Sequence, residues 1–458
     1  MKNILSLIFT LMLFFQSIAY ANAFNPQNVY NTIRELTQDK YAGRLAGDKG
    51  NELACEYVNK KFLEAKLQPL GDNKSFYQYF TAYVPFVEGD ISFKVFNGEK
   101  LVKEYAYGID YKEIYTGASV GGFVRGKLYS DETSKGEIYI GVDYPYETMS
   151  TYEFDKTLAG KGIKAALYFS ERPMNFKSTY KIQNEYKEGL IKLLIDSRLY
   201  EEIRDFSDKG YIFEIKSPVK VKKVKTKNII GVKKAASSEK PPIIFSAHID
   251  HVGYDAGGRI YPGALDNASG VAFMLEILNV LKDVETNRDI IFIAFNAEEE
   301  GLIGSYYFVN RPPINIENAE CINFDMIGSP KEIPLSALSS SQRSDELSAF
   351  VNEQNLNRLY EDNSDHAPFN MRNISAVTLI HDDMEKIHTT FDTIENIDVK
   401  KIEEAFETIE KYLLERGILL TKPEEQENAK NTYLIYVALI PILAAGVYIG
   451  INRKKFQI

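Results

Sequence analysis

The sequence predicts an α/β protein, with a mostly parallel mixed sheet flanked by helices on both faces and a β-rich domain inserted into it. Three observations support this prediction. From residue 226 onward, short apolar runs alternate with helical patterns, which is typical of a parallel sheet. Between about 86 and 225, the chain changes to short β-rich runs and turns. Residues 24–85 contain a helical pattern, and we expect them to form one domain with residues 226–420.

The helical pattern comes first along the chain. In DKGNELACEYVNKKFLEAKL, apolar side chains recur at helical intervals, at Leu53, Ala54, Tyr57, Val58, Phe62 and Leu63. In the inserted region, ISFKV, GKLYS and GEIYIGV are typical of short strands, and we expect a helix near 186–206. The run KSPVKVKKVKTK (216–227) alternates lysine with valine, which predicts a strand with one solvated face.

Residues 226–420 contain the alternating elements. The predicted strands are PPIIFSA, DIIFIAF, ECINFD and ISAVTLI. The predicted helices are ASGVAFMLEILNVLKD and DVKKIEEAFETIEKYLLE. Because helical crossovers make the strands parallel, the carboxyl ends of these strands should meet at one edge of the sheet.

The N-terminal end predicts a secretory signal. Residues 1–23 contain one early lysine, an uncharged apolar stretch and small residues near the end. We expect cleavage after Ala21 or Ala23. An uncleaved N-terminal anchor is the alternative.

The C-terminal end predicts a membrane anchor. Residues 432–451 are apolar, uncharged and long enough to cross a bilayer once. They follow a polar tether at 421–431 and precede a basic tail at 452–458, which should stay on the cytoplasmic side. We therefore expect an exported protein that is anchored in the cell membrane, with its folded part on the extracellular side.

Composition excludes some partners. The net charge is −10, and a nucleic-acid surface needs clustered Lys and Arg, so we expect no nucleic-acid binding. The two cysteines are too few for a disulfide framework and do not identify the compartment.

Acids and histidines follow each predicted strand of the α/β region. The chain has five histidines, and two of them lie three positions apart after PPIIFSA. The side chains that follow the four strands, together with an aspartate in the Gly-rich loop YPGALDNASG, are His248, Asp250, His251, Glu298, Glu299, Asp325, His388 and Asp266. Since sites in open α/β sheets form at the carboxyl ends of the strands, these side chains should converge.

Imidazole and carboxylate ligands without thiolates suit Zn²⁺ or a similar divalent ion. One contributor from each of the four strand ends, together with Asp266, would give two imidazoles and three carboxylates, which exceed what one open tetrahedral zinc needs. They suit two ions that share a carboxylate and lie about 3.5–4 Å apart. Two alternatives remain on local grounds. Asn267 or Ser269 could cap a helix, and the acids of NAEEEG could be a solvated helix start.

The sequence resembles the M28 family of dizinc peptidases. The matching stretches are AHIDHVG, YPGALDNASGVA, FNAEEEGLIGS, NFDMIG, SDHAPF and IHTTFDT, in the order and at the spacing of that family, over about 250–395. YAGRLAGDKGNELACEYV and SFYQYF also resemble its opening helix and first strand. The resemblance implies a zinc aminopeptidase-like fold with two Zn²⁺ per chain.

The resemblance also implies a role for each site residue. One zinc would be held by His248 and Asp325, and the other by Glu299 and His388. The bridging ligand would be Asp266. The general base would be Glu298, and Asp250 would hold the His248 ring in its metal-binding tautomer.

Some residues near the motifs are not expected to bind metal. His251 does not match a ligand position of the family, and we expect a structural or rim role. Asp365 and His366, in SDHAPF, should lie beside the pocket, where they either contact substrate or form structural hydrogen bonds. Residues 86–225 resemble, more weakly, the protease-associated domain often found in this family. A plain family-specific insertion is the alternative.

The function that fits best is a metallo-aminopeptidase that cleaves peptides with a free N-terminus. No motif that carries a proposed ligand contains Arg or Lys, so the pocket should attract an amine and repel a carboxylate. Three alternatives remain open. One is a dizinc carboxypeptidase, for which Arg259 or Arg343 could bind the terminal carboxylate. The others are a one-zinc enzyme related to glutaminyl cyclases and a non-catalytic, receptor-like ectodomain.

Overall fold

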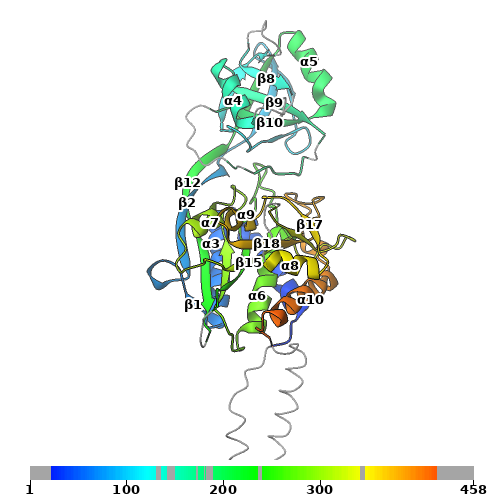
Figure 1. The fold of residues 1–458 in the computed structure, drawn as a ribbon. Helices are drawn as coiled ribbons and strands as arrows, with labels where there is room; N and C mark the ends of the chain where they lie inside the picture. The colour runs from blue at the N-terminus through cyan, green and yellow to red at the C-terminus, as the bar shows by residue number, and fades with distance from the viewer. Residues whose placement is uncertain are drawn as a thin grey trace, which may run out of the picture.

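The computed structural model describes residues 22–129, 136–141, 150–171, 174–179, 181, 189–235, 240–340 and 346–419. A large mixed sheet forms the body of this part of the chain (Figure 1). Its strands follow the order β1 (Gln68–Pro69), β12 (Val219–Lys233), β14 (Ile290–Phe295), β13 (Ile243–His248), β15 (Glu320–Asp325), β18 (Ser375–Ile380), β16 (Ser336–Leu338) and β17 (Asn357–Leu359), and β2 (Tyr77–Val87) pairs with β12. The neighbours β14, β13, β15 and β18 are parallel. The predicted fold class is therefore confirmed.

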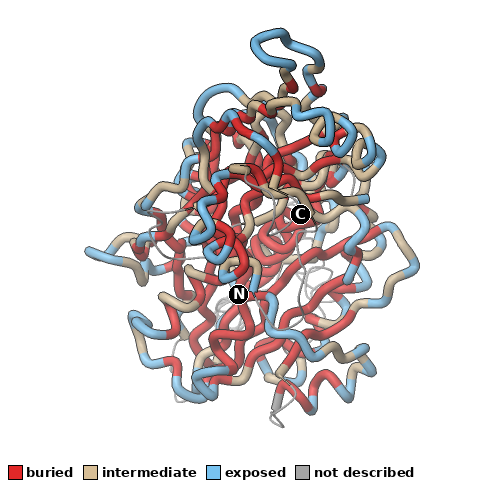
Figure 2. Tube along the Cα trace, turned by 90° about the horizontal axis from the view of Figure 1, so that it is seen from above, coloured by how far each residue is buried: buried red, intermediate tan, exposed pale blue. Residues whose placement is uncertain are grey.

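Both faces of this sheet are buried, as expected of a parallel sheet. Alternate residues of β14 enter different cores: Ile290, Phe292 and Ala294 join one, and Ile291, Ile293 and Phe295 join the other. The first core includes side chains of α2 (Pro26–Leu36), α3 (Lys49–Glu64), α6 (Gly270–Leu281), α8 (Glu346–Glu353) and α10 (Val399–Glu415). The second includes side chains of α7 (Ile303–Asn310) and α9 (His366–Met371). Figure 2 shows the buried trace in the interior of the molecule, surrounded by exposed loops.

The most apolar helix is an internal one. Among the described residues, the segment 264–281, which includes α6, is long and apolar enough to span a bilayer, but 94% of it is buried inside the protein. It packs against β13 and β15 and belongs to the core of the domain. The predicted signal sequence (through residue 21), the tether from 421 and the helix at 432–451 lie outside the described residues.

The inserted region contains two smaller sheets around a core of its own. One follows the order β5 (Tyr111–Glu113), β10 (Ile191–Asp196), β9 (Ala165–Ser170), β8 (Ile138–Gly141) and β7 (Leu128–Tyr129). The other follows the order β4 (Lys100–Glu104), β3 (Ser92–Asn97), β11 (Ile212–Ser217) and β6 (Gly122–Gly126). Its helices in the described part are α4 (Thr151–Gly160) and α5 (Tyr200–Asp208).

The helix predicted near 186–206 is wrong for residues 189–196. Residues Ile191–Asp196 form β10, which pairs with β9 on one side and β5 on the other, and the helix α5 begins only at Tyr200. The run IKLLID is apolar enough for either structure. Its pairing with two strands from other parts of the chain selects the extended form.

Two long strands connect the inserted region to the body. β2 and β12 pair antiparallel from Tyr77↔Ile229 to Val87↔Val219, and the insert lies beyond the latter end (Figure 1). The lysine-rich run predicted as a strand forms the end of β11 and the first half of β12. Residues 219–225 of the predicted insert range 86–225 therefore belong to the large sheet.

Candidate metal centre

One pair of site residues ends two neighbouring strands. His248 is the last residue of β13 and Asp325 the last of β15, and these strands are adjacent and parallel. Their side chains therefore meet at the carboxyl edge of the sheet, with His248 Nε2 3.4 Å from Asp325 Oδ1. Ser364 Oγ donates to the other oxygen, Asp325 Oδ2, at 2.8 Å. We call His248 and Asp325 the strand-held pair.

A second pair lies on loops. Glu299 follows β14 in a turn where Ala297 has a left-handed backbone (φ 57°). His388 lies in the long loop after β18 and is itself left-handed, with φ 55°. The His388 Nε2 atom is 3.0 Å from Glu299 Oε2. We call Glu299 and His388 the loop-held pair.

Asp266 faces both pairs with different oxygens. Its Oδ1 is 3.5 Å from His248 Nε2, and its Oδ2 is 3.2 Å from His388 Nε2. The Asp392 carboxylate orients this loop, because it accepts hydrogen bonds from the backbone N–H groups of Leu265 and Asp266 at 2.8 and 3.0 Å. The Asp266–Asn267 peptide bond is cis.

These donors fit two divalent ions. Donor atoms that surround a tetrahedral zinc at about 2.0–2.2 Å lie roughly 3.3–3.5 Å from one another. The imidazole nitrogens and carboxylate oxygens here approach within 3.0–3.5 Å, in two groups that share Asp266, and His251 also belongs to the group of the loop-held pair. The strand-held pair with Asp266 Oδ1 can hold one ion, and the loop-held pair with Asp266 Oδ2 can hold the other.

The charges in the centre also favour bound cations. Burial would lower the pKa of His388, but the adjacent carboxylate of Glu299 raises it to about 10. Burial would raise the pKa of Glu299, but the imidazoles of His388 and His251 lower it to about 2. The carboxylates are thus in such excess that the buried imidazoles attract protons, and divalent ions would neutralise the same negative charge.

Glu298 lies next to this cluster and has a different environment. Burial raises its pKa well above the ordinary value, and the carboxylate of Glu299 adds to the effect, while His248 acts in the opposite sense. Its carboxyl group is not within either donor group. The structure therefore separates the two adjacent acids, one inside a donor group and one beside it.

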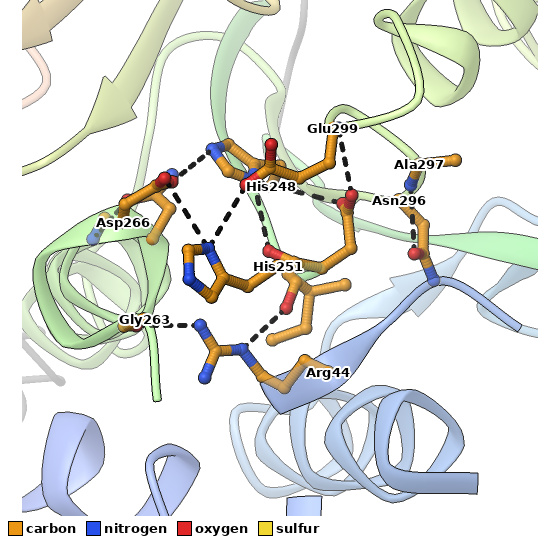
Figure 3. Close-up of polar contacts among 12 residues, drawn as sticks. Arg44, His248, His251, Gly263, Asp266, Asn296, Ala297 and Glu299 are labelled. Carbon is orange, nitrogen blue, oxygen red and sulfur yellow. Dashed lines mark hydrogen bonds and ion pairs between the residues drawn. The ribbon is translucent and has the colours of Figure 1, made fainter. Parts of the chain in front are cut away.

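His251 lies inside the cluster and is completely buried, so a place at the rim does not describe it. Its Nδ1 donates to Glu299 Oε1 at 3.1 Å and is 3.5 Å from Asp266 Oδ2 (Figure 3). Glu299 thus uses one oxygen toward His251 and the other toward His388, just as Asp325 divides its oxygens between Ser364 and His248. A supporting hydrogen bond of this kind orients a metal-binding carboxylate.

Asp250 is buried close to His248, but its carboxylate does not make the expected hydrogen bond to the His248 ring. The Asp250 side chain is 3.9 Å from His248 Nδ1, which is longer than a hydrogen bond. The backbone carbonyl of Asp250 lies closer, at 3.3 Å, so it can accept the Nδ1 proton and leave Nε2 as the ligand atom. The carboxylate instead accepts the backbone N–H of Glu299 at 3.1 Å and ties the two loops together.

Asp365 and His366 are both buried at the start of α9. The His366 ring nitrogens are 2.9 Å from Thr378 Oγ1 and from the carbonyl of Glu361, and burial lowers its pKa to about 4. This histidine therefore makes structural hydrogen bonds and leaves no ring nitrogen for substrate. Burial raises the pKa of Asp365 to about 7, with His248 acting in the opposite sense.

Arg44 supports the site and was not foreseen from the sequence. Its guanidinium is fully buried and donates to the carbonyls of Ile249, Leu36, Pro262 and Gly263 at 2.7–3.0 Å. Figure 3 shows the bond to Gly263. Arg44 thus connects the end of β13 with the loop that carries Asp266. Asp392 was missed as well, although both residues lie in stretches that resemble family motifs, YAGRLAG and IHTTFDT.

Comparison with solved structures identifies the fold. An aminopeptidase from Aneurinibacillus sp. strain AM-1 aligns with a TM-score of 0.64 at 22% identity, over 84% of this chain and 92% of that one. BSAP, a zinc aminopeptidase from Bacillus subtilis, aligns with a TM-score of 0.63 at 21% identity, over 86% of this chain and 95% of that one. The molecule has the fold of the zinc aminopeptidases.

Sequence comparison finds similar proteins as well. The model of peptidase family M28 matches residues 228–413, which include all the proposed ligands. Aminopeptidase YwaD of Bacillus subtilis (strain 168) is 25% identical over 402 residues, which cover 82% of this chain and 81% of that protein. Residues 228–413 thus resemble peptidase family M28, and the chain as a whole is similar to an aminopeptidase.

Proposed function

We propose that the chain is a two-zinc aminopeptidase that removes N-terminal residues from peptides. The observation that carries the proposal is the position of Asp266, which offers one oxygen to the strand-held pair and the other to the loop-held pair. The similarity to Aminopeptidase YwaD over most of both chains supports the same activity. We also propose that residues 1–23 direct export and that residues 432–451 anchor the enzyme, with its catalytic domain on the extracellular side.

The proposed roles are those that the family resemblance implies, and the positions of the residues support them. Bound zinc ions supply Lewis-acid chemistry, which polarises a peptide carbonyl and makes water a better nucleophile. The five proposed ligands, which would hold the two ions, are His248, Asp266, Glu299, Asp325 and His388. Glu298, which lies beside the donor groups, accepts the proton of the attacking water and passes it to the leaving amine.

The charged side chains near the centre favour an amine over a carboxylate. The Arg259 guanidinium, a candidate for binding a C-terminal carboxylate, donates to Asp255 at 2.7 Å and to the carbonyl of Met174 at 3.1 Å. Arg44 is occupied by four carbonyls. Arg343 lies outside the described residues. The acids of the centre remain to attract a cationic α-amine, with Asp365 as a proposed further contact.

Peptides blocked at one end test which terminus is read. We expect hydrolysis of amino-acid p-nitroanilides and of short peptides with a free N-terminus. Acetylation of the N-terminus should remove most of the activity, whereas amidation of the C-terminus should change it little. The reverse pattern would identify a carboxypeptidase, and zinc binding without hydrolysis of any peptide would favour a receptor-like ectodomain.

Glu298→Gln tests the proposed general base. Glutamine keeps the shape of the side chain but cannot accept the proton, so the rate of hydrolysis should fall about 10²–10⁴-fold. The zinc content should remain at two per chain because the ligands are intact. Loss of zinc in Glu298→Gln, with retention in Glu299→Gln, would reverse the roles of the two acids.

A further inference from the structure

A short segment of the insert lies directly against the loop that carries His388. Phe176 and Thr389 form an antiparallel bridge, and the backbone N–H of Lys177 donates to the His388 carbonyl at 2.8 Å. The Phe176 ring stacks on the His388 imidazole, with centroids 6.0 Å apart and an angle of 26° between the planes. The insert thus contacts both the backbone and the ring of a proposed ligand.

The same segment is anchored on its other sides. Lys177 is 3% exposed, and its Nζ donates to the carbonyls of Val252 and Tyr254 at 2.5 and 2.7 Å, just after His251 in the chain. The Ser178 hydroxyl accepts the backbone N–H of Tyr115, which lies beyond β5 of the insert. Lys177 therefore joins the loop after β13 to the loop that carries His388, and Ser178 holds the segment to the insert.

His388 needs such support more than the other ligands do. It belongs to no strand or helix, and its left-handed backbone (φ 55°) costs about 1–3 kcal/mol for a residue with a side chain. A conformation of this kind persists only where the surroundings stabilise it. Within the described structure, the Lys177 N–H is the group that bonds to the His388 carbonyl, and Phe176 packs on the imidazole face.

We propose that Phe176 and Lys177 are positioning residues through which the inserted domain completes the metal centre. They hold His388 in the orientation in which its Nε2 faces Glu299 and Asp266. The ion of the loop-held pair then depends on the insert, whereas the ion of the strand-held pair does not. This inference rests on the proposed function in one respect, namely that His388 is a zinc ligand.

Zinc binding by Phe176→Ala provides the test, because it does not require catalytic activity. We expect a chelator titration of the wild-type protein to show two bound ions. In Phe176→Ala, the affinity for one of them should fall about 10–100-fold, as is typical when an outer contact of a ligand is lost, while the affinity for the other stays within error. Phe176→Tyr keeps the stacked ring and should restore both affinities.

Two further variants complete the experiment. Phe123→Ala removes an exposed phenylalanine of the insert, on β6, and should leave both affinities unchanged. Lys177→Pro removes the N–H that bonds to His388 and should weaken the same ion as Phe176→Ala. Urea unfolding of every variant shows whether the fold has changed.

The zinc affinities and unfolding midpoints of these variants distinguish a positioning role from a role in the fold. Unchanged affinities in both Phe176→Ala and Lys177→Pro would overturn the inference. Parallel loss of both ions together with a lower unfolding midpoint would also overturn it, since the segment would then support the fold rather than one ligand. If the wild-type protein binds two ions but cleaves no peptide, the proposed function fails while the positioning role can still be measured. A wild-type protein that binds no zinc would exclude both.

Discussion

The strand-held and loop-held pairs of the metal centre differ in what keeps their side chains in place. His248 and Asp325 end adjacent parallel strands, so the sheet itself brings them close together, and the Ser364 hydroxyl then holds one oxygen of Asp325. Glu299 and His388 lie in loops, and each depends on contacts from elsewhere. Glu299 is oriented by His251 and Asp250, and His388 is contacted by the inserted domain. The strand-held pair is thus positioned mainly by its own strands, whereas the loop-held pair is positioned by residues from other parts of the chain. A mutation far from the loop-held pair in the sequence can therefore disturb it.

Substitution of ligands gives the largest expected effect. His248→Ala and His388→Ala should each leave about one zinc per chain, since each pair holds its own ion, and Asp266→Ala should lower the affinity for both ions. Each variant should lose at least ~100-fold in the rate of peptide hydrolysis, more than is typical for an outer contact. Elemental analysis after dialysis checks the metal content. Equal zinc loss in all three variants would contradict two separable halves.

Removal of Arg44 should destabilise the connection between the halves. Its guanidinium bonds to carbonyls on both the strand-held side and the Asp266 loop, and Arg44→Met leaves four carbonyls, three of them in buried bonds, without this donor. We expect a loss of roughly 3–5 kcal/mol in the free energy of unfolding, measured in urea. Arg34→Met, which removes an exposed arginine of α2, is the matched control and should cost under about 0.5 kcal/mol. Similar losses in both variants would show that Arg44 has no special role.

His251 should matter for the loop-held ion more than for the other. In His251→Ala, Glu299 loses the donor to its Oε1, so the affinity of one ion should fall about 10–100-fold. His251→Asn places an N–H close to the position of Nδ1 and should lose less. Chelator competition measures both ions separately. Preferential loss of the strand-held ion, identified by comparison with His248→Ala, would reverse the assignment.

His381 should give the smallest effect, and it depends on pH. This residue begins the loop that leads to His388, and its Nδ1 accepts the backbone N–H of Gly328 at 3.1 Å. Burial lowers its pKa from 6.5 to about 4, so between these values the unfolded chain binds a proton that the folded chain does not. The free energy of unfolding should therefore fall as the pH drops from 6.5 towards 4.

His381→Asn tests this effect, because asparagine offers an acceptor near the position of Nδ1 but does not titrate. At pH 5.5 the wild-type protein should have lost roughly 1 kcal/mol relative to the variant, compared with their difference at pH 7.5. Urea unfolding of the two proteins in the same buffers provides the measurement. A difference that stays constant over this range would show that His381 is protonated, or free to become so, in the folded protein.

Much of the fold could be predicted because its signals are local. The four parallel strands are short apolar runs, and α6 and α10 have clear helical periodicity, so these elements were located within a few residues. The shorter helices α7, α8 and α9 were not predicted. The error at 191–196 has a non-local cause, since IKLLID becomes a strand through pairing with β5 and β9. The arrangement of the insert into two sheets depends on similar long-range pairing.

The same distinction applies to the site. The strand-held pair could be predicted from strand ends, and the remaining ligands from motifs of the family. The supports could not, because Arg44 contacts Ile249 across 205 positions and Lys177 contacts His388 across a similar distance in the chain. No pattern in the sequence around Phe176 indicates that its ring will lie on an imidazole. The placement of His251 also required the structure, because it depends on where Glu299 directs its two oxygens.

The antiparallel pair of strands β2 and β12, which we call the stem, determines how the inserted domain could be removed or exchanged. Val87 and Val219 are register partners at the end of the stem, so the whole insert enters and leaves the body through a single hairpin end. A tight turn could join these two positions directly, because antiparallel strands need as few as two linking residues. The connections of the chain therefore allow the inserted domain to be deleted, or to be replaced by the inserted domain of a relative that has the same pair of strands. A replacement domain must also restore the contact with the loop of His388. Exchanges at this pair of strands can therefore test how a protein gains an inserted domain and keeps its metal centre.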